Sequence, residues 1–151
     1  MTESTAFSKH ARIKARRSVV QALYQCEMAQ AATAEVIKEF LDERDEMKKA
    51  DKDYFCELLK GITARIEELN NEMKPFLDRP VNELDPVERA VLHLGVYELL
   101  QRPELPWRVV VNESVELAKM FGAEQSYKFI NGVLDKIARK VRITEISNAA
   151  L

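Results

Sequence analysis

The chain has little of what several common classes of protein require. Its 151 residues include only two cysteines, four glycines and one tryptophan. Cys26 and Cys56 lie far apart and lack metal-ligand spacing, so we expect two reduced thiols that pack in a cytoplasmic protein. No apolar run approaches the roughly 18 residues of a membrane-spanning helix, and the N-terminus lacks the apolar region of a signal peptide. We therefore expect no membrane partner and a location in the cytoplasm.

The groups that catalysis would need do not converge either. The sequence contains no glycine-rich phosphate loop and no Glu-x-x-His pair of a di-iron bundle. Of the two histidines, His10 lies in a basic segment and His93 in an apolar one. Glu113 and Glu116 are spaced as on many amphipathic helices, where Lys119 provides an ion pair. We expect no enzyme activity, no catalytic residue, no metal and no cofactor.

The patterns that are present are those of a helical protein. A composition of 46% apolar and 32% charged residues is ordinary for a globular chain of this length, which can bury its own core. Apolar residues recur at helical spacing, and no stretch alternates with the period of a strand. We expect an all-α, compact bundle of six to seven helices. It would form a single domain over 8–146, between a disordered lead (1–7) and a C-terminal tail (147–151).

The clearest predicted helix lies near the C-terminus. Its apolar residues form one stripe, Ile130, Val133, Leu134, Ile137, Ala138 and Val141. Gly132 lies within this pattern, and we predict that the helix runs through it. A glycine inside a helix is unfavourable, so we expect that it allows close approach of a neighbouring helix. Phe129 lies outside the stripe, on the same side of the helix as Gln125, Lys128 and Lys136. Such a ring is a stacking surface for an unpaired base; the alternative is that Phe129 packs against another helix of the chain.

The segment Asp85-Pro86-Val87-Glu88 is a strong signal for the start of another helix. Asp85 can accept hydrogen bonds from the first free N–H groups, and proline is tolerated at the first helical position. Glu88 can complete a capping box, which gives it a structural role without any partner. The following residues are apolar on nearly every side, so this helix should be the central buried one.

The N-terminal segment carries a strong local charge. Five basic side chains and no acid lie within 9–17, namely Lys9, Arg12, Lys14, Arg16 and Arg17. Since the net charge of the chain is −2, the remaining residues carry −7. We predict a helix from Ser8 to about Gln30 whose first turns project and contact the phosphates of a polyanion. The alternative is an ordinary solvated face.

Two blocks of the sequence closely resemble the NusB family. The matching segments are VNESVELAK (111–119) with Phe121-Gly122, then KFINGVLD (128–135). The basic run followed by QALYQ (21–25) is similar to the N-terminus of the same family. These proteins are bacterial transcription antitermination factors, all-helical and built as two three-helix halves. They bind the boxA element of nascent RNA together with NusE, a small ribosomal subunit protein.

The resemblance implies that this chain binds boxA RNA with NusE and joins the RNA polymerase elongation complex with other Nus factors, chiefly on ribosomal RNA operons. Of the basic residues, Arg12, Lys14 and Arg16 lie where the family places basic side chains. Together with Lys9, Arg17, Gln125, Lys128 and Phe129, which the charge and helix patterns indicate, we expect them to form one RNA surface. Tyr24 and Glu88 match residues on the surface that the family shares with NusE. The chain departs from the family pattern at Ile13, within the basic run. It departs also at Arg17, where an acid is expected, and at Gln125, where many members carry aspartate.

Two other functions stay open. A NusB-like domain also forms the N-terminus of some ribosomal RNA cytosine methyltransferases, and we expect no such enzyme here because the sequence ends at Leu151 without a cofactor-binding domain. The second alternative is a purely protein-binding helical adaptor whose basic segment only aids solubility. A homodimer is a further option, since self-association would mask a basic surface.

Overall fold

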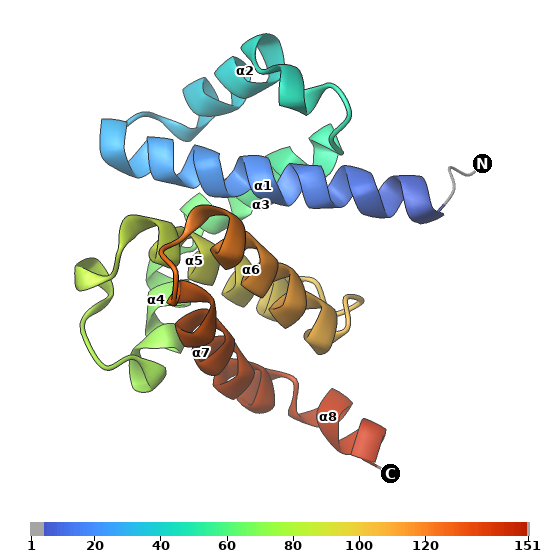
Figure 1. The fold of residues 1–151 in the computed structure, drawn as a ribbon, viewed down its shortest axis with the longest axis vertical. Coiled ribbons are helices and arrows are strands. Elements are labelled where there is room, and N and C mark those ends of the chain that lie inside the picture. Colours follow the sequence, from blue (N-terminus) through green and yellow to red (C-terminus); the bar gives the residue numbers. More distant parts are fainter. Residues whose placement is uncertain (1–4, 151) are drawn as a thin grey trace. The chain divides into compact units, whose positions relative to one another are not determined.

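The computed structural model describes the backbone of residues 5–150 and the side chains of 9–148. Within these residues it contains eight α-helices, three 3₁₀ turns and no strand, which confirms the all-α prediction (Figure 1). No helix in this range is long and apolar enough to cross a membrane. The chain divides into an N-terminal unit (1–64) and a C-terminal unit (65–151). The first has the three α-helices expected of each half, whereas the second has five, so the number of helices in the described residues exceeds the six to seven predicted. Each unit is described by itself.

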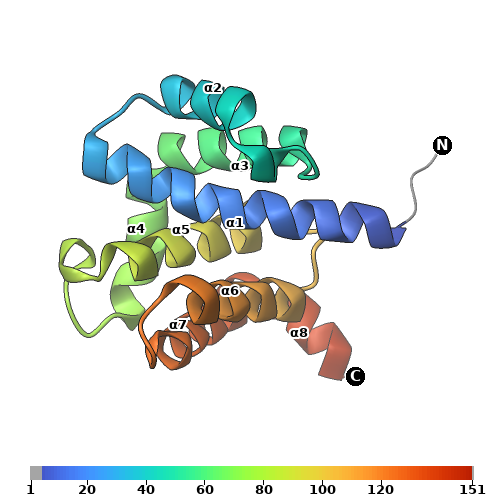
Figure 2. The ribbon, with the colours of Figure 1, turned by 45° about the horizontal axis from the view of Figure 1, so that its top comes forward.

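The N-terminal unit consists of three α-helices and one short turn. They are α1 (Thr5–Ala29), α2 (Thr33–Glu43), η1 (Asp45–Met47) and α3 (Lys52–Ala64). Helix α1 begins at Thr5 rather than Ser8, so residues 5–7 of the predicted disordered lead belong to a helix. The rest of that lead, residues 1–4, lies outside the described residues. Both α2 and α3 pack against α1 and against each other (Figure 2).

The core of this unit is formed by one face of each helix. Phe40 of α2 and Phe55 of α3 are fully buried, and their ring centres lie 5.5 Å apart in a stacked arrangement. Val19, Val20 and Leu23 of α1 are also buried. Burying each such side chain contributes roughly 1.5–3 kcal/mol to folding, which fixes the three helices in register.

The connection between α2 and α3 is held firmly on α1. Met47 in η1 is buried. The Asp51 N–H donates to the Ala11 carbonyl of α1 at 3.0 Å. Arg44 donates to the Gln25 side chain of α1 at 3.0 Å. The charged connection between α2 and α3 therefore has a defined position along α1.

The C-terminal unit contains the remaining five α-helices. They are α4 (Ile66–Met73), α5 (Pro86–Gln101), α6 (Trp107–Phe121), α7 (Ser126–Val141) and α8 (Ile143–Ala150), with the turns η2 (Lys74–Phe76) and η3 (Val81–Glu83) between α4 and α5. Helix α5 packs against α4, α6 and α7, and α6 and α7 lie side by side (Figures 1 and 2). Helix α8 includes residues 147–150 of the predicted tail.

Helix α5 is the buried helix that its sequence predicts. The Asp85 side chain accepts from the N–H groups of Val87 at 2.7 Å and Glu88 at 3.3 Å, so the predicted N-cap is confirmed. Pro86 is the first helical residue, and every residue from Ala90 to Leu99 is buried. Local capping and all-round apolarity thus predicted both the start and the position of this helix.

Close approach of helices occurs at Gly95 and not at Gly132. A Cβ atom added at Gly95 would lie 2.8 Å from Leu134 Cδ1 and 2.9 Å from Ser114 Oγ, closer than side chains allow. A Cβ added at Gly132 would have no described neighbour within 4 Å. The predicted helix–helix contact at Gly132 was therefore wrong, although α7 does run through this glycine.

A buried arginine joins the end of α7 to the connection between α5 and α6. Arg142 is 7% exposed. It donates to the backbone carbonyls of Leu99 (2.8 Å), Leu105 (2.8 Å), Arg102 (3.0 Å) and Glu98 (3.3 Å). It also donates to Glu145 at 2.6 Å, and the second Glu145 oxygen accepts from the Trp107 N–H at 3.0 Å.

The environment of Glu145 favours its ionised form. Burial alone would raise the pKa of this carboxyl group, which is ordinarily 4.5. The hydrogen bonds from the Trp107 amide and from Arg142, together with the charge of Arg142, outweigh burial and lower the pKa. The ion pair at the start of α8 therefore stabilises the folded unit at neutral pH.

Candidate nucleic-acid interface

One side of α1 offers basic and aromatic side chains to solvent. Lys14, Arg17, Gln21 and Tyr24 follow one another at helical spacing, and we call this side the Lys14 face. Lys14 and Arg17 are half-buried, and Tyr24 is 44% exposed. Among the described residues, no carboxylate lies in ion-pair distance of Lys14 or Arg17. Lys9, five residues before Lys14, is exposed and lies on a different side of the helix.

The other two predicted arginines of α1 pack against α3. The Arg12 and Arg16 guanidinium carbons lie 4.7 Å and 5.5 Å from the ring centre of Tyr54. Arg12 also lies 3.8 Å from the carboxylate of Asp51. Arg16 is only 5% exposed, so the prediction that all the basic residues project was wrong for this side chain. The reason is the ring of Tyr54, which attracts cations to this side of α1.

A second polar surface lies at the start of α7. Gln125 is the residue before the first turn of the helix, and its exposed side chain makes no capping bond. Lys128 is exposed, whereas Phe129 is half-buried. The guanidinium carbon of Arg79 lies 5.2 Å from the centre of the Phe129 ring. We call Gln125, Lys128, Phe129 and Arg79 the Phe129 surface.

The geometry of Phe129 falls between the two alternatives that the sequence left open. Its ring does not belong to the buried stripe of α7, which begins at the next residue, Ile130. The ring lies beside Arg79, and the residue as a whole is half-buried. A ring in this position can stack on a base without leaving its place in the fold.

Glu88 connects the starts of α5 and α7. The buried hydroxyl of Ser126 donates to its carboxylate at 2.7 Å. In a capping box the Asp85 N–H would donate to the Glu88 side chain. Here Glu88 accepts from Ser126 instead, so the predicted capping box was wrong. Glu88 remains half-buried, and its role toward a partner stays a prediction.

Sequence reasoning missed Arg79, Ser126 and two loop lysines, Lys48 and Lys49. Arg79 lies in a connector between two prolines, where no periodicity indicates which side chains meet a helix. Its Nε donates to Asp78 at 3.0 Å, and this bond raises the pKa of Arg79, so the side chain is always charged. Lys48 and Lys49 are adjacent in the sequence, but the acidic residues around them leave this segment without a net positive charge that would indicate a phosphate contact.

Groups that would support other chemistry are not assembled in the described residues. Cys26 and Cys56 are free and half-buried, and burial raises the pKa of both thiols. Thiols with a raised pKa are poor nucleophiles at neutral pH. No group of three or more His, Cys, Asp or Glu side chains in this range is arranged to hold a metal ion.

The fold and the two surfaces define an all-helical protein of the kind that contacts a polyanion through exposed cations and aromatic rings. The model of the NusB family matches residues 13–139. Transcription antitermination protein NusB of Alcanivorax borkumensis is 50% identical over 137 residues, covering 91% of each chain. The NusB protein of Nitrosococcus oceani is 49% identical over 140 residues, covering 93% of each chain. This chain belongs to the NusB family, as its sequence motifs predicted.

Solved structures agree with this conclusion. NusB of T. maritima is 34% identical, with a TM-score of 0.76 over 85% of this chain and 90% of its own. A structure of the antitermination factors NusB and NusE in complex with dsRNA contains a chain that is 27% identical. It matches with a TM-score of 0.72 over 87% of this chain and 98% of its own.

Proposed function

We propose that this protein is a transcription antitermination factor that binds boxA-type RNA together with NusE. It joins the elongating RNA polymerase complex with other Nus factors, chiefly on ribosomal RNA operons, and it acts in the cytoplasm without enzymatic activity. The observation that carries the proposal is family membership over nearly the whole chain, with relatives named for antitermination. The related structure that holds NusE and dsRNA supports both partners.

The accessible cations of α1 supply the phosphate contacts. Lys9, Lys14 and Arg17 have no competing carboxylate among the described residues, so approaching RNA need not displace an intramolecular ion pair. Arg12 contributes less, because Asp51 and Tyr54 already hold it. Contacts of this kind position RNA but do not distinguish its sequence.

The Phe129 surface supplies a contact to an unpaired base. A base stacks on the accessible part of the Phe129 ring, and the Arg79 guanidinium adds positive charge beside it. Gln125 has both donor and acceptor atoms free for base edges or backbone. Lys128 contacts a neighbouring phosphate. Tyr24 and Glu88 are each a contact for NusE.

Filter binding with purified protein tests this function. A boxA RNA and a scrambled RNA of the same length and composition are titrated with and without NusE. We expect preference for boxA RNA, and an increase in its affinity with NusE of about 5–150-fold, a typical coupling between two ligands. The same factor must appear when RNA is added to the NusE titration.

Two results would overturn the proposal. Equal affinity for both RNAs, with or without NusE, would remove the boxA function. Binding of NusE that RNA does not affect, with no RNA affinity, would instead identify a protein-binding adaptor. The relation to methyltransferase domains is less favoured, because this chain covers 91% of the length of an antitermination relative.

A further inference from the structure

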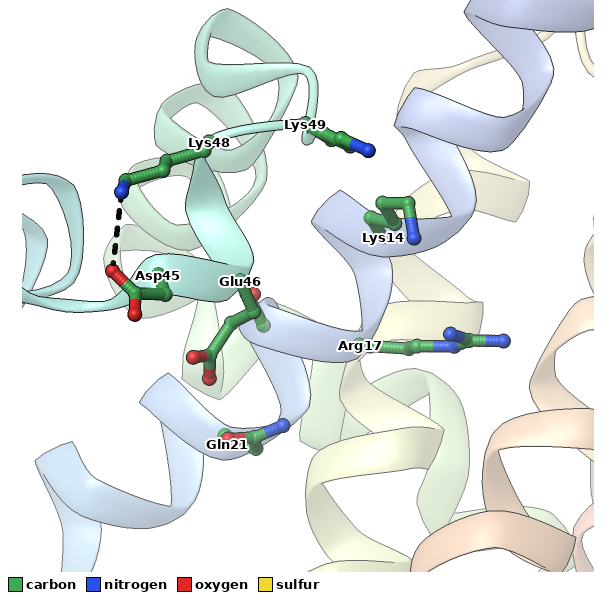
Figure 3. A pocket seen from close by; sticks show the side chains of 8 residues that line it. Lys14, Arg17, Gln21, Asp45, Glu46, Lys48 and Lys49 are labelled. Carbon is green, nitrogen blue, oxygen red and sulfur yellow. Dashed lines mark ion pairs between the residues drawn. The ribbon is translucent and has the colours of Figure 1, made fainter.

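A basic groove lies between α1 and the connection that follows α2, entirely within the N-terminal unit (Figure 3). Its volume is about 290 Å³. Lys14, Arg17 and Gln21 line it from the Lys14 face of α1, and Lys48 and Lys49 line it from the connection. The groove therefore joins two segments that are about 30 residues apart in the sequence.

The fold holds the second wall of the groove in place. Met47 anchors η1 in the core, and the Asp51 N–H bonds to the Ala11 carbonyl at 3.0 Å. Lys48 and Lys49 lie between these two anchor points. Lys49 is thus presented beside α1 by a fixed backbone, although its own side chain is exposed.

The two carboxylates at the groove form ion pairs with cations other than Lys14, Arg17 and Lys49. Asp45 lies 3.4 Å from Lys48, and Glu46 lies 3.8 Å from Arg44. In Figure 3 Lys48 turns toward Asp45, whereas Lys49 extends to the α1 side of the groove. No carboxylate of the described residues forms an ion pair with Lys14, Arg17 or Lys49.

We propose that this groove, around Lys14, Arg17 and Lys49, binds backbone phosphates of the RNA, with Lys49 as a contact supplied by the α2–α3 connection. The inference rests on the proposed RNA-binding function. Three uncompensated cations on two walls favour a polyanion, and the Gln21 amide can donate to a phosphate oxygen. No aromatic side chain lines the groove, so nothing there can stack on a base. The contact therefore adds affinity and not sequence preference.

The salt dependence of RNA binding tests this assignment. Lys49→Gln is compared with the unchanged protein and with Lys60→Gln, an exposed lysine of α3 that makes the same change in net charge away from the groove. Affinity for boxA and scrambled RNA is measured by fluorescence anisotropy between 50 and 200 mM salt. A lost phosphate contact lowers the slope of log affinity against log salt by about 0.7–0.9. Over this fourfold range of salt the difference amounts to about threefold in affinity.

We expect Lys49→Gln to lower the slope for both RNAs, and Lys49→Gln with Lys14→Gln to lower it about twice as much. Lys60→Gln should leave the slope unchanged, and thermal melting should be unaffected by either exposed change. Equal slopes for Lys49→Gln and Lys60→Gln would overturn the proposal. Weaker binding to NusE with an unchanged RNA slope would also overturn it, and would assign the groove to an acidic protein surface.

The same experiment separates this inference from the proposed function. Loss of preference for boxA RNA in the unchanged protein contradicts the function, whereas the dependence of the slope on Lys49 tests the groove alone. Absence of all RNA binding by the unchanged protein would overturn both.

Discussion

Removal of the buried guanidinium of Arg142, the residue after α7, should destabilise the C-terminal unit more than a change of any charged residue within α7. Two of its acceptors depend on it most. Residue 103 is proline and has no N–H, so the Leu99 carbonyl cannot be satisfied by the next helical turn. Arg142 Nε supplies that bond at 2.8 Å, and its terminal nitrogen bonds Leu105 at the same distance.

The size of this destabilisation depends on which of the four carbonyls bonded by Arg142 keep another hydrogen-bond donor. The Glu98 carbonyl also accepts from the Arg102 N–H, and the Arg102 carbonyl accepts from the Leu105 N–H, each at 3.0 Å. Arg142→Met therefore leaves chiefly two carbonyls without a donor, at about 1–3 kcal/mol each. The lost pair with half-exposed Glu145 adds about 0–1 kcal/mol. We expect a loss of about 2–7 kcal/mol in the free energy of unfolding, centred near 4 kcal/mol.

Urea unfolding monitored by tryptophan fluorescence measures this loss. Trp107 is the single tryptophan and is buried in the same unit, so its emission reports on that unit. With a urea slope of about 2 kcal/mol per molar, the midpoint should fall by about 2 M. Lys140→Met is the control, since this exposed side chain has Glu72, at 3.3 Å, as its one ion-pair partner among the described residues. A midpoint for Arg142→Met equal to that of Lys140→Met would refute the reasoning.

Four further changes have distinct expected results. Phe129→Ala should cost roughly 1–3 kcal/mol of RNA affinity and less stability than the roughly 3–5 kcal/mol of a core phenylalanine; titration and melting of one variant measure both, and a core-sized loss of stability would exclude stacking. Gln125→Asp should weaken RNA binding more at low salt than at high salt through repulsion of phosphate, whereas equal affinities at low salt would place Gln125 outside the interface. Because the pKa of Glu145 is lowered from 4.5, its stabilisation is complete above pH 4.5 and is lost as the pH falls through the folded value; urea midpoints of Glu145→Gln should be flatter over this range. Arg16→Ala should lower the melting temperature more than Lys14→Ala, since only Arg16 is buried on α3, and equal melting would contradict this.

The sequence predicted those structural features that depend on residues close together in the chain. The N-cap at Asp85 and the all-round apolarity of the helix after it lie within one continuous segment, and both appear in α5. The position of Gly95 against Leu134 depends on a segment nearly 40 residues away, so the sequence did not distinguish it from Gly132. The bonds of Arg142 to the end of α5 span 43 residues and were missed for the same reason.

In the basic segment of α1, the number of charges does not say which side chains pack against α3 and which meet solvent. At about 100° per residue, Arg12 and Arg16 lie within about 40° of each other on the helical wheel. Lys14, Arg17 and Gln21 lie on a different side, centred about 150° away. The first side meets the ring of Tyr54, and the second side meets solvent and the groove.

One run of like charges therefore has two roles. The wheel separates the two sets of side chains from the sequence alone, but it does not say which set faces α3. That depends on Tyr54, which the chain supplies nearly 40 residues later. Since a buried arginine contributes to folding and an accessible one to RNA affinity, the two sets should differ in what their substitution changes. The contrast between Arg16 and Lys14 in both assays is consequently a sharper test of the RNA surface than removal of the whole basic segment.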